Sequence, residues 1–284
     1  MFNERIFDAI QVQIECGHTE RGVHILIGTM LSAEAGSAAR QALHKHPLHS
    51  LLMEDPYSWR AAAKPRGYAG DAMLIDLIYD QQAPDKTSAI GRRLFSVTTA
   101  FPVSDAVRHR RSIMEEKLAK AFLQGKRICS LACGHFREGD PLIGEDLRSI
   151  TLVDQDTLSL AHIEGNHGAN ITLVEANVLH FLRNAASRHE KFDLIYTLGL
   201  TDYLDHRAMR LLHKLMKACL APRGQIFLAN FVPDHLARGW MDAVMDWHLI
   251  YRTEDELRAY ACEIDLEPQT WLDPTRSIAF CEMS

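Results

Sequence analysis

The stretch Lys126 to Asp140, Lys-Arg-Ile-Cys-Ser-Leu-Ala-Cys-Gly-His-Phe-Arg-Glu-Gly-Asp, decides how the rest of the chain is interpreted. Its first part, Arg127–Ala132, is small and apolar, which predicts a parallel strand buried on both faces. A glycine turn at Gly134 follows. A second predicted strand, Ser149–Val153, leads to Asp154, about 20 residues after that glycine. An acidic residue at this spacing binds ribose hydroxyls in nucleotide-binding βαβ units, so the stretch predicts a site for an adenosine-containing cofactor.

The residues after Gly134 indicate which cofactor. Dinucleotide sites use Gly-x-Gly-x-x-Gly, whose middle glycine lets the backbone approach the pyrophosphate. Phe136 occupies that middle position here and Glu138 follows, so a ring is expected to block a diphosphate and a carboxylate to repel it. S-adenosylmethionine (SAM), which carries ribose and adenine but no phosphate, still fits. The alternatives are a turn without any ligand and a nicotinamide-dependent oxidoreductase, which Phe136 disfavours.

Composition excludes several classes of protein. The 284 residues are 47% hydrophobic and 24% charged, as in ordinary globular chains, and the net charge of −6 argues against nucleic acid as a partner. No run approaches the roughly 18–20 apolar residues of a membrane span, and no signal peptide is predicted. The six cysteines are scattered, so reduced thiols and a cytoplasmic location are expected. The histidines at 44, 46 and 49 lack a recognised ligand spacing, so no metal site is predicted.

Helices are predicted for the first part of the sequence from apolar spacing and capping residues. They cover residues 1–60 and the segments Ala72–Tyr79, Ser88–Phe101 and Ser104–Gly125. Pro102 is expected to end the third of these segments and Ser104 to cap the fourth. The basic run at residues 108–111 is interpreted as a solvated helix face.

From Lys126 onwards, short apolar runs alternate with helical stretches, which is typical of a parallel α/β sheet. The predicted strands are Arg127–Ala132, Ser149–Val153, Ile171–Glu175, Phe192–Thr197, Gln225–Phe231, Glu267–Leu272 and Ser277–Glu282. The predicted helices between them include Thr157–His167, Arg207–Leu220 and Thr253–Cys262. The last two strands are expected to form a hairpin that places an antiparallel strand at the sheet edge. We therefore expect an α/β, Rossmann-like seven-stranded core over residues 111–284, preceded by an N-terminal helical region and cofactor lid over 1–110.

Ligands of such folds bind beyond the carboxyl ends of the strands. The candidate cofactor-binding residues at those ends are Ala132, Cys133, Gly134, Asp154, Gln155, Asn177, Val178 and Thr197. Asn177 offers an amide to the adenine edge or is only a turn residue, and Asp156 is interpreted as a helix N-cap. Tyr68 and Asp71, in the Pro-Gly loop at residues 65–71, are candidates for lid contacts, and Asp71 is also a candidate N-cap.

The acceptor is expected to lie beside the segments that follow the fourth and fifth strands. The segment Trp240–Arg252 is amphipathic and is either a core helix or part of the wall of an acceptor pocket. The candidate acceptor-binding residues are Leu200, Tyr203, Trp247, Tyr251 and Arg252. A carboxylate acceptor is ionised at pH 7 and needs no general base. For an amine or hydroxyl acceptor, the candidate catalytic bases are His135, Asp202 and His248.

Three stretches carry a family resemblance. They are Pro65–Asp71 with Leu74–Tyr79, Leu131–Gly134 with Arg137-Glu138, and Asp246–Thr253. Together with the strand pattern they resemble class I SAM-dependent methyltransferases, in particular a bacterial subgroup that includes the hydroxy-fatty-acid methyl ester synthases of quorum signalling. The usual second glycine of the SAM turn is replaced by Phe136.

The resemblance implies SAM contacts at Gly134, Asp154 and Asn177, with lid contacts at Tyr68 and Asp71. It also implies S-adenosylhomocysteine (SAH) as the product and a small-molecule acceptor, such as the carboxyl group of a hydroxy fatty acid. Methylation of an amine or a hydroxyl group in a secondary metabolite, a non-catalytic SAM-binding regulator and a homodimeric assembly stay open as alternatives.

Overall fold

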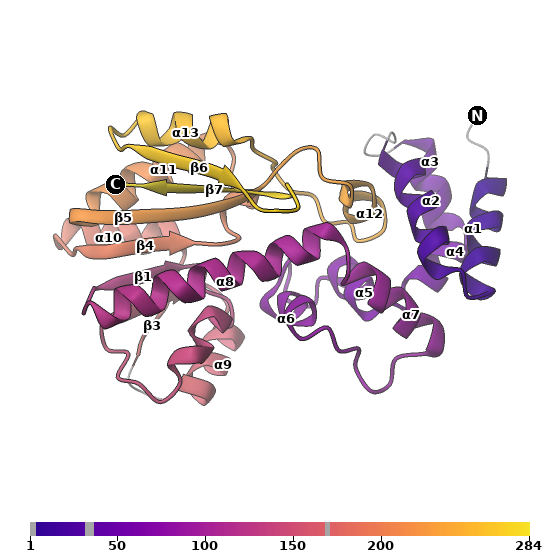
Figure 1. The fold of residues 1–284 in the computed structure, drawn as a ribbon, viewed down its shortest axis with the longest axis horizontal. Coiled ribbons are helices and arrows are strands. Elements are labelled where there is room, and N and C mark those ends of the chain that lie inside the picture. Colours follow the sequence, from indigo (N-terminus) through magenta and orange to yellow (C-terminus); the bar gives the residue numbers. More distant parts are fainter. Residues whose placement is uncertain (1–3, 32–36, 168–170) are drawn as a thin grey trace. The chain divides into compact units, whose positions relative to one another are not determined.

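The computed structural model describes residues 4–31, 37–167 and 171–284, and it divides the chain into two compact units (Figure 1). Unit 1 comprises Met1–Arg108 together with Asp234–His248. Unit 2 comprises His109–Pro233 together with Leu249–Ser284. The chain therefore leaves unit 2 after its fifth strand, contributes a short segment to unit 1 and returns. The predicted division between residues 110 and 111 did not include this excursion.

Unit 1 is helical, as the sequence predicts. Its helices among the described residues are α1 (Arg5–Glu15), α2 (Thr19–Leu31), α3 (Ala38–Lys45), α4 (Pro47–Leu52), α5 (Pro56–Ala63), α6 (Ala72–Asp80), α7 (Ala89–Thr98) and α12 (Arg238–Ala243). Side-chain caps begin several of them. Asp55 caps α5, Asp71 caps α6 and Ser88 caps α7, each by accepting backbone N–H groups of the first turn. The prediction that Asp71 is an N-cap is confirmed.

Residues from the excursion complete the core of unit 1. Helix α12 packs against α2, where Gly239 lies so close to the Ile27 carbonyl that a Cβ atom would be 2.7 Å from its oxygen. Next to it, the fully buried Trp240 donates from Nε1 to Ser58 Oγ at 3.0 Å, and its ring meets the edge of Phe101. A glycine and an indole thus join segments far apart in the sequence into one hydrophobic core.

Helix α8 (Pro102–Leu123) begins earlier than predicted. The expectation that Pro102 ends a helix and Ser104 caps the next one is wrong. Proline is favoured at the first helical position, where its missing N–H has no partner to lose. Ser104 lies inside the first turn and donates to the Thr98 carbonyl. The basic run within α8 is not a solvated face either, because Arg108 donates to the carbonyls of Ile78 and Thr99 and Arg110 is 4% exposed.

Unit 2 contains a seven-stranded sheet with the order β3-β2-β1-β4-β5-β7-β6. Its strands are β1 (Ile128–Leu131), β2 (Ile150–Asp154), β3 (Thr172–Glu175), β4 (Phe192–Thr197), β5 (Leu220–Phe231), β6 (Pro268–Leu272) and β7 (Ile278–Met283). The first five are parallel, and β7 is antiparallel to both β5 and β6. The α/β, Rossmann-like fold with seven strands expected from the sequence is confirmed. The antiparallel strand lies between β5 and β6, however, and β6 forms the edge.

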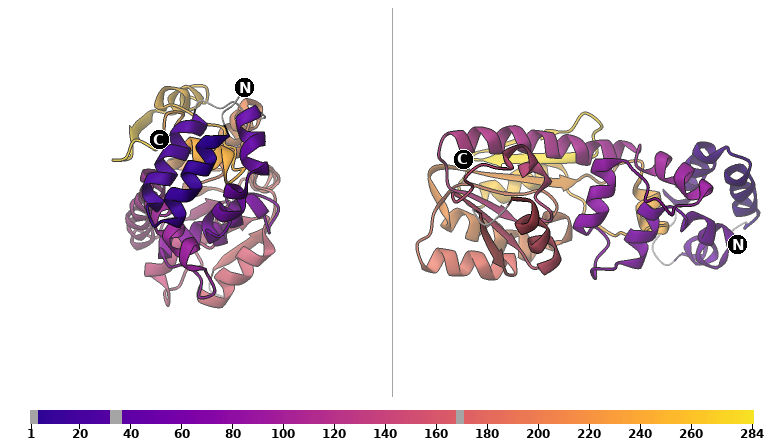
Figure 2. Two further views of the ribbon diagram at one scale, coloured as in Figure 1. Left: turned by 90° about the vertical axis from the view of Figure 1, so that its right-hand side faces the viewer. Right: turned by 90° about the horizontal axis from the view of Figure 1, so that it is seen from below.

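Helices cover both faces of this sheet (Figures 1 and 2). On one face, α10 (Val178–Ser187), α11 (His206–Ala218) and α13 (Glu254–Cys262) bury their apolar sides against the strands in one continuous core. On the other face, α8 reaches the sheet, where His109 meets the ring of Phe280 and Lys117 lies over Phe227. Helix α9 (Thr157–His167) packs beside β2 and β3. The loops that carry the candidate residues follow the carboxyl ends of β1 to β5.

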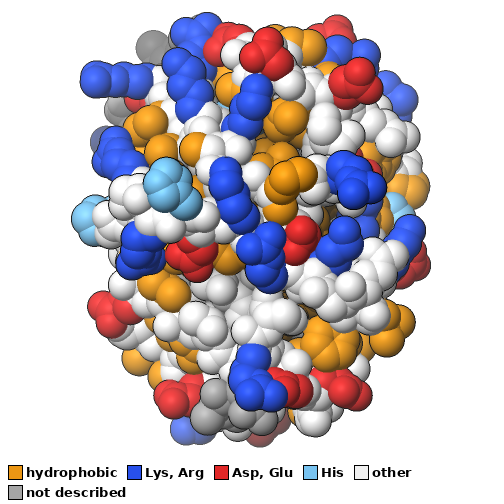
Figure 3. Space-filling model, turned by 90° about the vertical axis from the view of Figure 1, so that its left-hand side faces the viewer, with side chains coloured by type: hydrophobic (Ala, Val, Ile, Leu, Met, Phe, Trp, Pro, Cys, Tyr) orange, Lys and Arg blue, Asp and Glu red, His pale blue; other side chains and the backbone are white. Residues whose placement is uncertain are grey.

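The structure also describes the cysteines, the helix lengths and the surface. All six cysteines are free, and four of them are buried. Among the described residues, no helix is both long and apolar enough to span a bilayer. On the face drawn in Figure 3, basic side chains are prominent, with acidic and apolar side chains between them.

We expect Asp71→Ala to destabilise unit 1 by about 3–5 kcal/mol, because it leaves the partner of a buried ion pair uncompensated. The Asp71 carboxylate is fully buried, caps α6 at Leu74 N (2.8 Å) and binds Arg60 through two contacts of 2.7 Å. Urea unfolding followed by tryptophan fluorescence reports mainly on this unit, because three of the four tryptophans, Trp59, Trp240 and Trp247, belong to it, whereas Trp271 belongs to unit 2. The exposed Asp85→Ala is the control; equal midpoints for the two variants would contradict the assignment.

Candidate functional site

The chain turns sharply directly after β1. Ala132, Gly134 and Phe136 all have left-handed backbone, with φ of +54°, +53° and +52°. Glycine adopts such angles at no steric cost, whereas Ala132 and Phe136 must be held there by their surroundings. A hydrogen bond of 3.2 Å from Cys133 N to the Val153 carbonyl ties the turn to β2. The candidate cofactor residues of the turn thus form a strained and well-anchored segment.

Asp154, the last residue of β2, holds this turn through its carboxylate. One oxygen accepts from Gly134 N at 2.8 Å and the other from Asp156 N at 2.9 Å. Burial raises the pKa of Asp154, while the backbone N–H groups of Asp156, Gly134 and Gln155 act in the opposite direction. The two carboxylate oxygens together offer four lone pairs, so the carboxylate can accept a further hydrogen bond. The side chain can therefore hold the turn and bind a ligand hydroxyl group at the same time.

The Phe136 ring does not block the turn as the sequence suggested. It lies in the protein interior, where a Cβ atom on Gly139 would come within 2.0 Å of it, and it also packs against His167. The glycine at position 139 is needed because the ring occupies the space of a side chain. The argument that the ring itself excludes a diphosphate is therefore wrong.

A different feature disfavours a diphosphate. Between β1 and β2, a stretch that the structure describes in full, the chain forms only the short 3-10 helix η1 (Arg137–Leu142). Diphosphates bind in Rossmann folds at the N-terminus of the α-helix after β1, which this stretch of the chain lacks. The first turn of η1 also carries the acidic residues Glu138 and Asp140. The site therefore suits a nucleoside more than a dinucleotide.

The residues after β2 and β3 fill several roles. Asp156 accepts from Leu158 N and Ser159 Oγ, which confirms its predicted capping role at α9. Asn177 caps α10 through Oδ1, and its side chain is exposed. Gln155 is exposed beside Asp154, whereas Val178 packs into the hydrophobic core. The structure thus leaves Gln155 and Asn177 accessible to a ligand and assigns Val178 to the core.

The carboxyl end of β4 contains two buried polar groups. The Thr197 side chain is fully buried, and its Oγ1 has no hydrogen-bond partner among the described residues. Arg110, from α8, donates from Nη1 to the carbonyl of Leu198, the next residue. Directly before Thr197 in the same strand, Tyr196 donates its hydroxyl to Glu138 at 2.8 Å. Burial raises the pKa of Glu138, although the nearby Arg110 acts to lower it.

The loop after β4 is fixed by a buried arginine. The guanidinium of Arg252, 1% exposed, donates to the Thr201 carbonyl at 2.7 Å, to Asn230 Oδ1 at 3.0 Å and to the Leu204 carbonyl. Its hydrogen bonds join the loop after β4, the end of β5 and the segment that re-enters unit 2. Arg252, a predicted acceptor-binding residue, is therefore engaged in holding these loops together.

Asp202, a candidate base, belongs to the same arrangement. It lies in the short 3-10 helix η2 (Thr201–Tyr203), is 1% exposed and accepts from Phe231 N at 2.8 Å. Burial raises its pKa to about 7, against the lowering effect of that N–H group and of two arginines. Of the neighbouring acceptor candidates, Tyr203 is 40% exposed and Leu200 packs against the core. Tyr251 is half-buried in the re-entering segment of unit 2.

His135, a candidate catalytic base in the turn after β1, stacks on another histidine. Its ring lies nearly parallel to that of His162 in α9, with centroids 4.0 Å apart and planes at 16°. This contact fixes the orientation of the His135 imidazole beside Gly134. The assignment of His135 as a catalytic base stays a prediction.

The other candidates lie in unit 1. The predicted helix over residues 240–252 ends at Ala243, and the chain then turns through Asp246, whose φ is +46°. Trp247 is buried and Tyr68 is half-buried within the unit, while both oxygens of Asp71 face Arg60. Trp247, a predicted acceptor-binding residue, is thus part of the helical unit. The lid contacts predicted for Tyr68 and Asp71 stay predictions.

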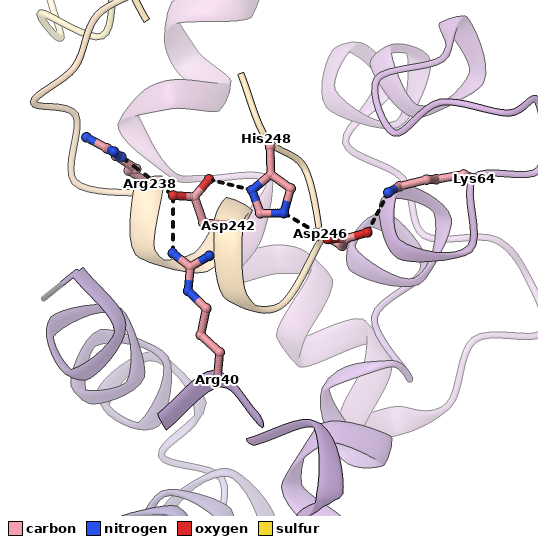
Figure 4. Close-up of polar contacts among 6 residues, drawn as sticks. All are labelled: Arg40, Lys64, Arg238, Asp242, Asp246 and His248. Carbon is pink, nitrogen blue, oxygen red and sulfur yellow. Dashed lines mark hydrogen bonds and ion pairs between the residues drawn. The ribbon is translucent and has the colours of Figure 1, made fainter. Parts of the chain in front are cut away.

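His248 is held between two aspartates (Figure 4). Its Nδ1 faces Asp242 at 3.3 Å and its Nε2 faces Asp246 at 2.8 Å. The aspartates are paired in turn with cations: Asp246 with Lys64 at 2.5 Å, and Asp242 with Arg40 and with an arginine of its own helix. Within unit 1, the imidazole therefore belongs to an exposed network of polar and charged side chains.

Sequence reasoning did not predict the positions of three side chains of this region: Arg110, which it assigned to a solvated face, Glu138, which it considered only as a charge that repels a diphosphate, and Tyr196. A signal for Arg110 was present, since it follows Val107 by three residues and precedes Met114 by four. Both of those residues are buried, so the spacing places Arg110 on the buried face of α8. The pairing of Glu138 with Tyr196 had no such signal, because this tertiary contact joins η1 to β4 across a long stretch of sequence.

Comparison with known proteins shows a similar fold but does not establish a function. No protein-family model matches the sequence, and no curated protein is similar to it. Among solved structures, a possible exported protein from Bordetella parapertussis is similar over 98% of this chain and 96% of its own, with a TM-score of 0.57 and 17% identity. The SAH-bound magnesium protoporphyrin IX methyltransferase of Synechocystis PCC 6803 matches over 64% of this chain and 86% of its own, with a TM-score of 0.48 and 14% identity.

We expect folding stability to fall between about pH 4 and pH 7 in a way that Asp202→Asn removes. A carboxyl group whose pKa is raised in the folded state, here to about 7, stabilises the fold while protonated, and this stabilisation is lost as the pH rises through that value. A difference of one between the pKa values of the folded and unfolded states corresponds to about 1.4 kcal/mol. Asparagine still accepts from Phe231 N, so the fold is retained.

The measurement is the free energy of unfolding of wild type and variant across this pH range. Asp205→Asn is the matched control, since Asp205 is an exposed cap that accepts from Ala208 N three residues further along. Identical pH profiles for wild type and Asp202→Asn would contradict the assignment.

Proposed function

We propose that this protein binds SAM at the turn after β1 and transfers its methyl group to a small-molecule acceptor. The observation that carries the proposal is the Asp154 carboxylate, which holds Gly134 at 2.8 Å at the carboxyl ends of β1 and β2. In Rossmann-like folds this is the place where an acidic residue binds ribose hydroxyls. Because η1 replaces the diphosphate-binding helix, a nucleoside cofactor is favoured over a dinucleotide.

The residues present fit such a cofactor. The Asp154 carboxylate retains accepting capacity for a ribose hydroxyl group beside its hydrogen bonds to the backbone. The exposed Asn177 at the end of β3 lies one strand further along and offers its amide nitrogen to the adenine edge. The loop after β4, fixed by Arg252, would then face the sulfonium end. The order of these elements along the sheet matches the order of base, ribose and amino acid in SAM.

When bound, SAM supplies a methyl group on a sulfonium, which is open to in-line attack by a nucleophile. The contribution of this chain would be to align the acceptor and to exclude water, which can provide a large part of the rate enhancement. Rigid loops suit this role, and the hydrogen bonds of Arg252 and Asp202 keep the loop after β4 in one conformation.

A carboxylate acceptor is the favoured substrate class within this proposal. Such an acceptor is already ionised at neutral pH and needs no general base. Asp202 is buried in a hydrogen-bonded network, and His248 is engaged by two aspartates in unit 1. His135 also has a partner, since its ring stacks on that of His162. All three candidate bases are therefore engaged within the protein, which supports the carboxyl group of a hydroxy fatty acid or a related acid over an amine or hydroxyl.

We expect wild-type protein to bind SAH in isothermal titration calorimetry and Asp154→Asn to bind it more weakly. The loss of a charge-assisted hydrogen bond corresponds to about 1.5–3 kcal/mol, or roughly 10- to 150-fold in Kd. Asp156→Asn, at the same edge of the sheet, removes a negative charge but keeps an oxygen that caps α9, and should leave the affinity unchanged. Absence of binding to wild type would remove the proposal.

The acceptor class has its own test, in which methyl-labelled SAM is incubated with a panel of 3-hydroxy fatty acids and of primary amines. Methyl esters release labelled methanol on mild base treatment, whereas N-methyl and ether products do not. We expect base-labile label with the acids. Stable label, or transfer to amines alone, would overturn the carboxylate assignment while leaving the methyltransferase proposal intact.

A further inference from the structure

A buried carboxyl group that has no part in the proposed chemistry lies directly after the turn that follows β1. Glu138 belongs to the first turn of η1, two residues beyond Phe136, and is 5% exposed. Its Oε1 accepts from the Tyr196 hydroxyl at 2.8 Å, and the Tyr196 side chain is fully buried in β4. A buried carboxylate is costly unless its hydrogen bonds are made, so this contact holds η1 against the sheet.

The groups around this contact fix its direction. Ser130 in β1 is the register partner of Tyr196, so both side chains lie on the same face of the sheet. Burial raises the pKa of the Tyr196 hydroxyl well above its ordinary value, while a hydrogen bond with Ser130 acts to lower it. Burial also raises the pKa of Glu138, whereas the Tyr196 hydroxyl, Arg110 and Arg111 act to lower it. The phenol therefore keeps its proton and donates, and the carboxyl group accepts.

The sheet order gives this contact a counterpart on the other side of the turn. Strand β1 lies between β2 and β4. On the β2 side, Asp154 accepts from Gly134 N at 2.8 Å, near the start of the turn. On the β4 side, Tyr196 holds Glu138, just beyond the end of the turn. The left-handed residues of the turn are thus constrained from both neighbouring strands, which such backbone angles require.

We propose that Glu138 and Tyr196 are positioning residues for the cofactor, because their hydrogen bond keeps the turn after β1 in the conformation that binds the nucleoside. The pair acts through the backbone of residues 133–136 and not by touching the ligand. Without the bond, the turn occupies the binding conformation for only a fraction of the time, and the apparent affinity falls by that fraction. Naming SAM as the ligand rests on the proposed function, whereas the constraint on the turn does not.

Calorimetry with two nucleosides tests the positioning role. SAH carries the amino-acid part of the cofactor, and 5′-methylthioadenosine lacks it. Tyr196→Phe keeps the ring and removes only the hydroxyl, and we expect it to weaken both ligands by roughly two- to tenfold, the range of one net hydrogen bond. The two factors should be equal, because the turn binds the part that both ligands share. A loss confined to SAH would mean direct contact with the amino-acid part and would overturn the positioning role.

Variants of the carboxyl group show whether the two side chains act through one bond. Glu138→Met should lose as much affinity as Tyr196→Phe, and the double variant should lose no more than either single one. Glu138→Gln keeps an acceptor and should bind SAH more tightly than Glu138→Met. Tyr260→Phe is the matched control, because it removes another buried phenol hydroxyl of unit 2, paired with His206, and should leave both affinities unchanged. Additive losses in the double variant would contradict a shared bond.

Hydrogen exchange of the free protein tests the turn without any ligand. We expect Tyr196→Phe to speed amide exchange in residues 132–140 and to leave the strands β1 and β4 unchanged. The proposal is overturned if exchange rises evenly throughout the sheet, or if the folded variant binds both nucleosides as wild type does. Failure of the proposed function looks different: wild type would then bind neither nucleoside, while exchange in the variant would still rise in residues 132–140 alone.

Discussion

The candidate site depends on a single carboxylate that joins two strand ends. Asp154 accepts from the backbone on either side of it, from Gly134 at the end of β1 and from Asp156 at the start of α9. Without this anchor, a turn containing left-handed Ala132 and Phe136 would relax toward ordinary backbone angles. The same carboxylate that would bind a ribose thus also maintains the conformation of the turn beside it. A change to Asp154 is therefore expected to affect both.

A second constraint fixes the other half of the site. The loop after β4 has little regular structure of its own, and it is held by Arg252 and Asp202, which reach the end of β5 and the re-entering segment of unit 2. Buried charged groups of this kind stabilise most when their hydrogen bonds are made. The network therefore favours one loop conformation strongly over alternatives. Arg110 approaches the same loop from α8 and donates from its guanidinium to the Leu198 carbonyl.

The sequence predicted the architecture well because regular elements follow from local patterns. The strands β1 to β4, the helix Thr157–His167 and the terminal hairpin were all visible in apolar spacing and turn residues. Errors arose where one residue type serves two purposes. Pro102 can end a helix or begin one, and only the packing of α8 decides that it begins one.

Site chemistry was predicted less well, for a related reason. Gly134 and Asp154 were identifiable, since their spacing is fixed by one strand–turn–strand unit. Arg252 was assigned to the acceptor and Arg110 to solvent, because burial of an arginine depends on carbonyl groups contributed by distant loops. Phe136 was expected to block a diphosphate, but its ring points into the interior, where Gly139 leaves space for it.

The excursion of residues 234–248 has a consequence for the order in which the protein forms. Unit 1 is built mostly from the beginning of the chain, yet its core includes Trp240, which bonds Ser58 across 182 positions of sequence. During synthesis the amino-terminal helices therefore leave the ribosome long before the residues that complete their hydrophobic core. Loop closure over such a span is entropically costly, so the amino-terminal helices must wait, incompletely packed, until most of the sheet strands have left the ribosome.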